Sequence, residues 1–219
     1  MKKLWIITIS AVVGWGVIIA LSMPLYAQMK GAPVPFSADW GYYDEGERRD
    51  GGKYYAASHA VRVEMTADER VHHLGPDGGP YAVIYNLKDI VAWIIDHTEC
   101  TYSEQKDIRF GMFWNNRIGH FGTPCPQDTR GRRIGRDTVQ GRSVEKWRCT
   151  YPEKHQIVVW YDTRLQTPIR IELDKEFDEY FELANIKEGP QPEKLFVPPP
   201  KYISYTHAVV MEGEHSCPQ

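Results

Sequence analysis

Apolar and polar residues alternate in short runs through most of the chain, which is the pattern of β-strands. Residues 61–65 read Val-Arg-Val-Glu-Met and predict a strand with one buried face. Two further apolar runs, residues 81–85 and 91–95, flank the polar stretch 86–89 and predict a hairpin. Residues 101–103 close this first meander.

A second meander is predicted in the C-terminal half. It begins with a strand around Trp147 and continues through the apolar runs 157–161, 169–173 and 179–186. Short strands joined by tight turns are typical of antiparallel pairing. The predicted fold class is therefore mainly β: a single curved antiparallel sheet of which the two meanders are the halves.

Helical patterns are few. The best one is residues 103–117, which begin at a serine suited to an N-cap and carry Ile108, Met112 and Phe113 at helical spacing. The chain from Gly189 onward is rich in proline and is expected to run extended across the surface. The sequence thus predicts few and short helices.

The first 27 residues form a segment of their own. Lys2 and Lys3 precede an uncharged run, residues 4–26, that ends at the small residue Ala27. This is the pattern of a secretory signal peptide cleaved after Ala27, or of an anchor that holds residues 4–26 in the inner membrane. Either way we expect export, to a periplasm of the Gram-negative type. The expected organisation is a signal peptide (1–27), a linker (28–35), one domain (36–202) and a C-terminal tail (203–219).

The charge balance argues against one large class of partners. Residues 1–27 hold two lysines and no acidic residue, so the rest of the chain has 24 Lys and Arg against 29 Asp and Glu, a net charge of −5. A surface with this balance repels phosphate backbones. We therefore expect no nucleic-acid partner.

The chain contains four cysteines, Cys100, Cys125, Cys149 and Cys217. An even number in an oxidising compartment favours disulfides, and the absence of CxxC argues against a redox centre or a zinc ribbon. The preferred pair is Cys125–Cys149, because it would tie a loop to the neighbouring strand, with a stabilisation of about 3–4 kcal/mol. The pairing of the other two cysteines stays open.

Catalytic and metal-binding patterns are absent from the sequence. It contains no GxSxG, no HExxH and no glycine-rich phosphate loop. His72 and His73 stand in the stretch VHHLGPDGG, which reads more simply as a solvated loop than as a metal site. Residues 96–100 include acidic, His and Cys side chains, but strand alternation divides them between two faces. We therefore predict no enzyme, no cofactor and no metal site.

One stretch is locally basic on this acidic chain. It reads TRGRRIGR and supplies Arg130, Arg132, Arg133 and Arg136. Guanidinium groups in such a cluster suit an anionic lipid head group or an acidic partner. Equally, basic residues commonly protect an exposed strand edge from unwanted pairing. Both interpretations are open at this point.

Five segments follow one another along the chain: GKYYAASHAVRVEM, AVIYNLKDIVAWIIDHTECTYSE, VQGRSVEKWRC, VVWYDTRLQTPIRIEL and ELANIKEGPQPEKLFVPPPKY. Taken in this order, they resemble the LolA/LolB-like superfamily of exported bacterial proteins, in a branch of unsettled function. The resemblance spans residues 36–202, and it implies a half-barrel whose apolar concave face is closed by short helices or loops. In that superfamily the best-studied members carry the acyl chains of lipoproteins across the periplasm without covalent chemistry.

The resemblance implies a periplasmic, non-catalytic module that binds a lipid acyl chain or a lipoprotein. The alternative is a structural or regulatory module that uses the same half-barrel to hold another cell-envelope protein. For any single apolar residue, a plain core role is the simpler interpretation. The residues predicted to line an apolar cavity are Val61, Val63, Met65, Trp93, Ile95, Trp147, Trp160, Ile169 and Ile171.

Overall fold

The computed structural model describes residues 31–65, 81–106, 121–126, 129–173 and 178–205. Twelve strands and one short 3-10 helix make up the regular structure of these residues. In chain order they are β1 (Phe36–Asp44), β2 (Glu47–Ala56), β3 (Ala60–Met65), β4 (Tyr81–Asn86), β5 (Val91–Asp96), β6 (Thr101–Lys106), β7 (Arg130–Val139), β8 (Arg142–Thr150), β9 (Gln156–Asp162), β10 (Thr167–Glu172), β11 (Tyr180–Glu188), η2 (Glu193–Phe196) and β12 (Ile203–Ser204).

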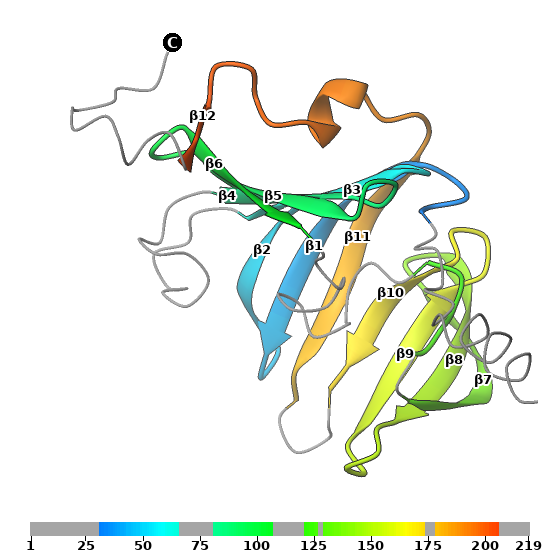
Figure 1. Cartoon of the computed structure of the whole chain (residues 1–219). Helices are drawn as coiled ribbons and strands as arrows, with labels where there is room; N and C mark the ends of the chain where they lie inside the picture. The colour runs from blue at the N-terminus through cyan, green and yellow to red at the C-terminus, as the bar shows by residue number, and fades with distance from the viewer. Residues whose placement is uncertain (1–30, 66–80, 107–120, 127–128, 174–177, 206–219) are drawn as a thin grey trace, which may run out of the picture.

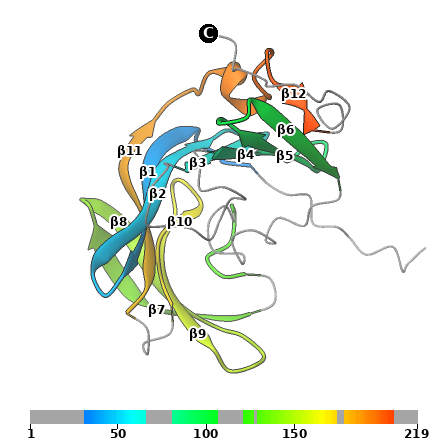
Figure 2. The ribbon, with the colours of Figure 1, turned by 90° about the vertical axis from the view of Figure 1, so that its left-hand side faces the viewer.

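All twelve strands belong to one sheet, in the order β12-β6-β5-β4-β3-β2-β1-β11-β10-β9-β8-β7. Every neighbouring pair is antiparallel except β12 and β6, which are parallel. The two meanders meet where β1 pairs with β11 (Figure 1). A side view shows the sheet curving strongly without closing into a barrel (Figure 2). The predicted fold class, a single curved antiparallel sheet, is confirmed.

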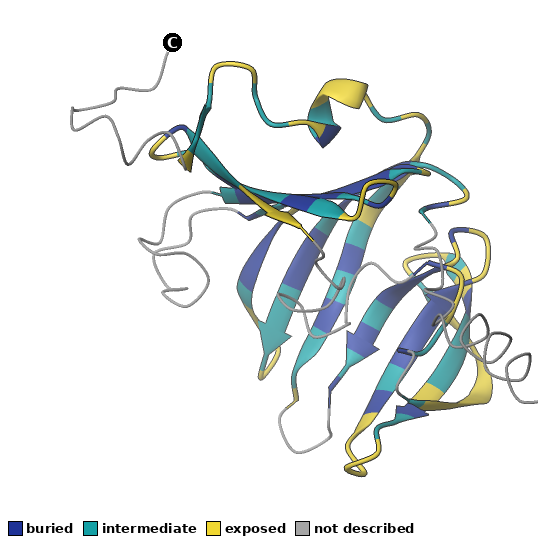
Figure 3. Cartoon of the chain, viewed as in Figure 1, coloured by how far each residue is buried: buried dark blue, intermediate teal, exposed yellow. Residues whose placement is uncertain are grey.

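Cross-strand register assigns each residue to one of the two faces. Tyr54 lies opposite Val63, and Val63 lies opposite Val83. Trp40 is on this face too, because it is two residues from Ala38, the partner of Tyr54. We call this the concave face and the opposite one the convex face. Burial alternates along β1 and β11, β3 is buried on both faces, and β7 is exposed (Figure 3).

The apolar–polar pattern of the sequence does not predict strands β1 and β2, and the reason is physical. Their pairing places Gly52 opposite Trp40, and a Cβ on Gly52 would approach Trp40 Nε1 to 3.0 Å and a backbone oxygen of Glu64 to 1.8 Å. Glycine is therefore required where the large indole lies across the neighbouring strand. The Trp40 indole N–H donates to that Glu64 oxygen at 2.8 Å. A strand with glycine at its centre and charged residues at its start shows no clear alternation.

Two hairpins turn on residue pairs that both have positive φ. Glu45 and Gly46 connect β1 to β2 with φ of 51° and 77°, and Gln140 and Gly141 connect β7 to β8 with φ of 49° and 76°. Two central residues in this region match the right-handed twist of the flanking strands. Both turns hold long adjacent strands in register.

The C-terminal segment corrects one prediction. Instead of running extended over the surface, it forms η2 and inserts Phe196, 3% exposed, against a convex-face cluster that includes Ile84 and Ile95. Arg62 Nη1 donates to the carbonyl oxygen of Leu195 at 3.1 Å. Figure 1 shows η2 and β12 on the side of β3–β6 that faces away from the lower strands. This segment is therefore part of the core on the convex side.

The predicted helix 103–117 is wrong where it can be compared. Residues 103–106 belong to β6, which pairs with β5, and residues 107–117 lie outside the described residues. The signal segment 1–27 and the histidines His72 and His73 also lie outside them. Within the described part of the chain, no helix has the length and apolar character needed to span a membrane.

The structure contains the predicted Cys125–Cys149 disulfide, with Cα atoms 5.6 Å apart. Cys149 is fully buried in β8, and Cys125 belongs to the loop 121–126. The bridge therefore fixes that loop to the sheet, as the sequence argument expected. Cys100 is disulfide-bonded as well.

Candidate functional site

The concave face carries two clusters of buried apolar side chains. Its main cluster includes Trp40, Tyr54, Val63 and Val83, all 5% exposed or less. Tyr42 packs against this cluster and also against a second one, formed by residues of β8–β11. An apolar surface of this extent is the kind that accommodates an acyl chain when the side chains covering it give way.

Three tyrosines introduce hydroxyl groups into this apolar face. Tyr54, Tyr81 and Tyr85 share it, because they lie opposite Val63, Met65 and Val61 of β3. Burial raises the pKa of all three phenols, that of Tyr85 to about 12. At neutral pH each of them is therefore a protonated hydroxyl that can donate a hydrogen bond.

The Tyr54 hydroxyl differs from an ordinary buried hydroxyl. The Tyr54 side chain is completely buried, and its oxygen has no hydrogen-bond partner among the described residues. Leaving a buried polar group unpaired costs about 1–3 kcal/mol. Natural cores rarely retain such a group, so this hydroxyl needs an explanation.

A described loop lies over part of the concave face. Phe121 joins the main cluster at 8% exposure, and Gly122 N–H donates to the carbonyl oxygen of Gln166 at 2.9 Å. The Cys125–Cys149 disulfide holds the other end of this loop. This part of the concave face is thus covered in the structure, whereas Tyr42 and Trp147 are only partly buried.

The predicted cavity wall is divided between the two faces. Val61, Val63 and Met65 are concave, opposite Tyr85, Val83 and Tyr81. Cross-strand pairs connect Tyr42 to Phe181, Ile171, Val159 and Trp147 in turn, so all of these residues are on the concave face too. Ile169 lies at a β-bulge of β10 and is buried in the main cluster. The residues of this set that the structure brings onto the concave face are Val61, Val63, Met65, Trp147 and Ile171.

The other three predicted residues are on the convex face. Trp93 lies opposite Ile84, and Ile95 opposite Ala82, in the cluster that Phe196 covers. Trp160 follows Val159 directly in β9, so its side chain points away from the face of Trp147. These three therefore do not share one groove with Val61, Val63 and Met65.

Trp160 is a packed core side chain held by polar neighbours. It is 4% exposed and packs in the main cluster, which at this end of the sheet also contains side chains that point to the convex face. Its indole N–H donates to Asp137 Oδ2 at 2.9 Å, which lowers the pKa of that carboxyl. Lys146 Nζ lies 4.2 Å and Arg170 Cζ 5.4 Å from the ring centroid. Cations on this ring and a carboxylate on its edge are the contacts of a structural residue.

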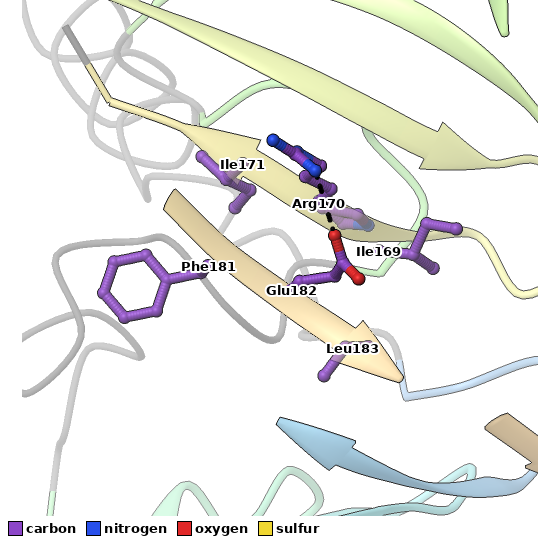
Figure 4. Close-up of a pocket in the computed structure, with 7 residues that line it drawn as sticks. Ile169, Arg170, Ile171, Phe181, Glu182 and Leu183 are labelled. Carbon is purple, nitrogen blue, oxygen red and sulfur yellow. Dashed lines mark hydrogen bonds and ion pairs between the residues drawn. The ribbon is translucent and has the colours of Figure 1, made fainter. Parts of the chain in front are cut away.

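A small hollow opens beside the bulge of β10. Its empty volume is about 170 Å³, below the roughly 300–1,000 Å³ of ordinary small-molecule pockets. Arg170 Nη1 and Glu182 Oε2 form an ion pair at 3.2 Å across it (Figure 4). The hollow is too small to hold an acyl chain as it stands. Its lining residues are Pro168, Ile169, Arg170, Ile171, Phe181, Glu182 and Leu183.

The polar residues at the end of β5 have structural partners of their own. Asp96 Oδ1 accepts hydrogen bonds from the backbone N–H groups of Thr98 and Glu99, at 2.8 and 3.0 Å. His97 Nδ1 lies 2.9 Å from the Tyr202 hydroxyl. These groups shape a turn and hold the C-terminal segment. Among the described residues, no group of three His, Cys, Asp or Glu side chains is arranged to bind a metal ion.

The four predicted arginines all lie on β7. Arg130, Arg132, Arg133 and Arg136 are exposed, and β7 is the last strand on its side of the sheet. Arg133 forms an ion pair with Glu145 at 3.2 Å. The structure therefore gathers these residues on one sheet edge, where Arg133 lies opposite Trp147 of the concave face.

No protein-family model matches the chain, and no curated protein matches its sequence. An uncharacterized conserved protein from Thermus thermophilus has a similar structure, with a TM-score of 0.51 and 12% identity over 78% of this chain and 89% of that one. MucB gives a TM-score of 0.45 and 17% identity over 74% of this chain and 57% of MucB, so the match spans little more than half of MucB. A LolA superfamily protein from Nitrosomonas europaea gives 0.32 and 10% identity over 78% and 91%.

LolA superfamily proteins are thus among the similar solved structures, as the sequence resemblance predicted. The likeness holds for the fold alone. At identities this low, no binding residue or partner can be carried from those proteins to this chain. Function is therefore inferred from the side chains of the concave face.

Sequence reasoning missed Tyr54, the residue that best marks this face. Its signal was present, because Tyr54 and Ala56 alternate with Lys53 and Tyr55 just before the predicted strand 61–65. Recognising it required the register between β2 and β3, which the sequence does not give.

Proposed function

We propose that this chain is an exported, non-catalytic protein of the periplasm whose concave face binds the acyl chain of a lipid or lipoprotein. The completely buried Tyr54 hydroxyl carries this proposal. It places an unused hydrogen-bond donor inside a mainly apolar surface. An acyl ligand would supply both partners that this surface needs: a long apolar chain, and a carbonyl oxygen that accepts one hydrogen bond.

The energetics favour such a ligand over a purely hydrocarbon one. Burial of an acyl chain contributes about 0.8 kcal/mol per methylene. A carbonyl that accepts from Tyr54 relieves a hydroxyl that is otherwise unpaired, and adds about 0.5–1.5 kcal/mol as a neutral hydrogen bond. Because burial raises the pKa of Tyr54, the hydroxyl keeps its proton and favours an acceptor.

Entry of the ligand requires the concave face to be uncovered. Phe121 belongs to the main cluster and to the loop 121–126, which is fixed to the sheet at Cys125. We infer that Phe121 moves away from the cluster while the disulfide keeps the loop attached. The acyl chain then replaces the contacts that the phenyl ring makes in the ligand-free protein.

The test measures acyl binding and stability on the same pair of variants. Titration of the protein with a fluorescent long-chain fatty acid, and then with palmitate as competitor, gives the affinity. Tyr54→Phe should weaken binding about two- to tenfold, since one neutral hydrogen bond is lost. The same change should leave the unfolding free energy of the ligand-free protein unchanged or raised, because it removes an unpaired buried hydroxyl.

Tyr55→Phe is the matched control, because it makes the same change at the next residue, on the convex face. It should leave the affinity as in the unmodified protein. The proposal fails if the unmodified protein shows no saturable binding, or if both variants lose affinity equally. A loss of about 1 kcal/mol in the stability of Tyr54→Phe would instead assign the hydroxyl to a buried water.

A further inference from the structure

Strand β7 leaves one edge of the sheet open. It pairs only with β8 in the described sheet, and nine of its ten residues are exposed. An edge strand directs every second N–H and C=O group outward, where these groups are available to another extended chain. The register shifts between Arg133 and Gly135, so the regular part of this edge begins with residues 130–133.

The convex side of this edge concentrates unneutralised positive charge. Arg132 lies directly opposite Arg148 of β8, and Arg130 lies two residues away on the same face. None of these three arginines has an ion pair with a described residue, in contrast to Arg133, which pairs with Glu145. Like charges directly opposite each other on neighbouring strands are destabilising. On a chain of net charge −3, this arrangement is a local exception.

We propose that the β7 edge binds an extended acidic segment of another protein, which adds to the sheet as a further strand. Carboxylates at alternate positions of such a segment would lie beside Arg130 and Arg132. Its main chain would use the outward N–H and C=O groups of β7. The cluster thereby exchanges a repulsion between arginines for guanidinium–carboxylate pairs.

A peptide strand accounts for more of the observations than an anionic lipid surface. A membrane would neutralise the arginines, but it would leave the outward backbone groups of β7 to water. An added peptide strand would pair with the arginines and with the outward backbone groups at the same time. Its alternating side chains would match the spacing of Arg130 and Arg132. The binding edge is distinct from the concave face, so this inference stands independently of acyl binding.

The probe is a capped, fluorescently labelled ten-residue peptide of alternating Glu and Thr. Fluorescence anisotropy should show saturable binding that weakens as salt is added. A Lys–Thr peptide of the same length should not bind. A Glu–Thr peptide with alternate backbone nitrogens methylated keeps its charge but cannot pair as a strand, and should bind far more weakly.

Two variants test the arginines. Arg132→Gln and Arg148→Gln should each weaken peptide binding roughly two- to fivefold, as expected for exposed ion pairs. Both should fold at least as well as the unmodified protein, because each removes the repulsion between the two guanidinium groups. Lys106→Gln, at the end of β6 on the other side of the sheet, is the control and should bind normally.

Hydrogen exchange locates the peptide. Amides of β7 should gain protection when the Glu–Thr peptide binds. Equal binding of the methylated peptide, or no added protection in β7, would overturn strand addition. Binding to phosphatidylglycerol vesicles without binding of the peptide would assign the arginines to a membrane surface and overturn the proposal as well.

Discussion

Replacing Trp160 by alanine distinguishes two roles of this residue: packing in the core and contact with a ligand. Trp160 is 4% exposed, and its indole N–H donates to Asp137 at 2.9 Å. Its side chain points to the convex face, away from the proposed acyl site. We therefore expect Trp160→Ala to lower the stability of the protein and to leave the acyl affinity unchanged.

The expected size of the loss follows from burial. A buried indole removes about 200 Å² from water, which at about 25 cal/mol per Å² gives near 5 kcal/mol as an upper value. Truncations of buried aromatic residues cost about 3–5 kcal/mol. The hydrogen bond adds little, because the exposed Asp137 carboxylate exchanges the indole for water. Trp160→Phe keeps most of the ring and should cost only about 1–2 kcal/mol.

Urea unfolding followed by far-UV circular dichroism measures these losses. With a slope near 2 kcal/mol per molar, Trp160→Ala should lower the midpoint by about 2 M at an unchanged slope. A loss below about 1 kcal/mol would refute the claim that the ring is packed core. Reduced acyl affinity at full stability would refute the assignment of Trp160 to the face opposite the ligand.

Two further outcomes can be measured in the same way. Replacing both Cys125 and Cys149 by alanine should cost about 3.5 kcal/mol, because their sequence separation of 24 residues sets the loop entropy released in the unfolded chain; a cost below about 1 kcal/mol would contradict this. Hydrogen bonding from Arg142, at 2.8 Å, lowers the pKa of Glu188 in the folded protein. The contribution of ionised Glu188 to the free energy of unfolding should therefore be complete above about pH 5 and disappear as the pH falls through the lowered pKa of the folded protein. Urea unfolding of Glu188→Gln at pH 7 and pH 3 checks this, and an equal difference from the unmodified protein at both pH values would contradict it.

The strands that sequence patterning located are those with one apolar and one polar face. Residues 61–65 alternate because Val61, Val63 and Met65 face the core while Arg62 reaches η2. The sequence shows β7 only as a basic stretch, because nearly all of its residues are exposed and it has no apolar alternation. The predicted helix over 103–106 failed because tertiary pairing with β5 overrides the helix propensity of Glu104, Gln105 and Lys106.

The candidate site was less predictable than the fold. Alternation shows that Val159 and Trp160 point to opposite sides, but not which side is concave. That choice depends on register carried across the sheet through β11 and β1, and a bulge at Ile169 adds one residue on the way. The predicted cavity wall therefore combines Trp147 with Trp93 and Trp160, which the fold places on the other face.

The two ends of the sheet differ in what they can join. At one end, Thr101 and Tyr102 of β6 are already paired with β12 of the same chain, and the rest of the strand carries Glu104 and Lys106. At the other end, ten residues of β7 stand at the edge. Growth of a filament by stacking copies edge to edge needs two complementary ends on each subunit. Two copies meeting through β7 alone would bring arginines against arginines, so the proposed strand addition would stop at one partner of opposite charge on each molecule.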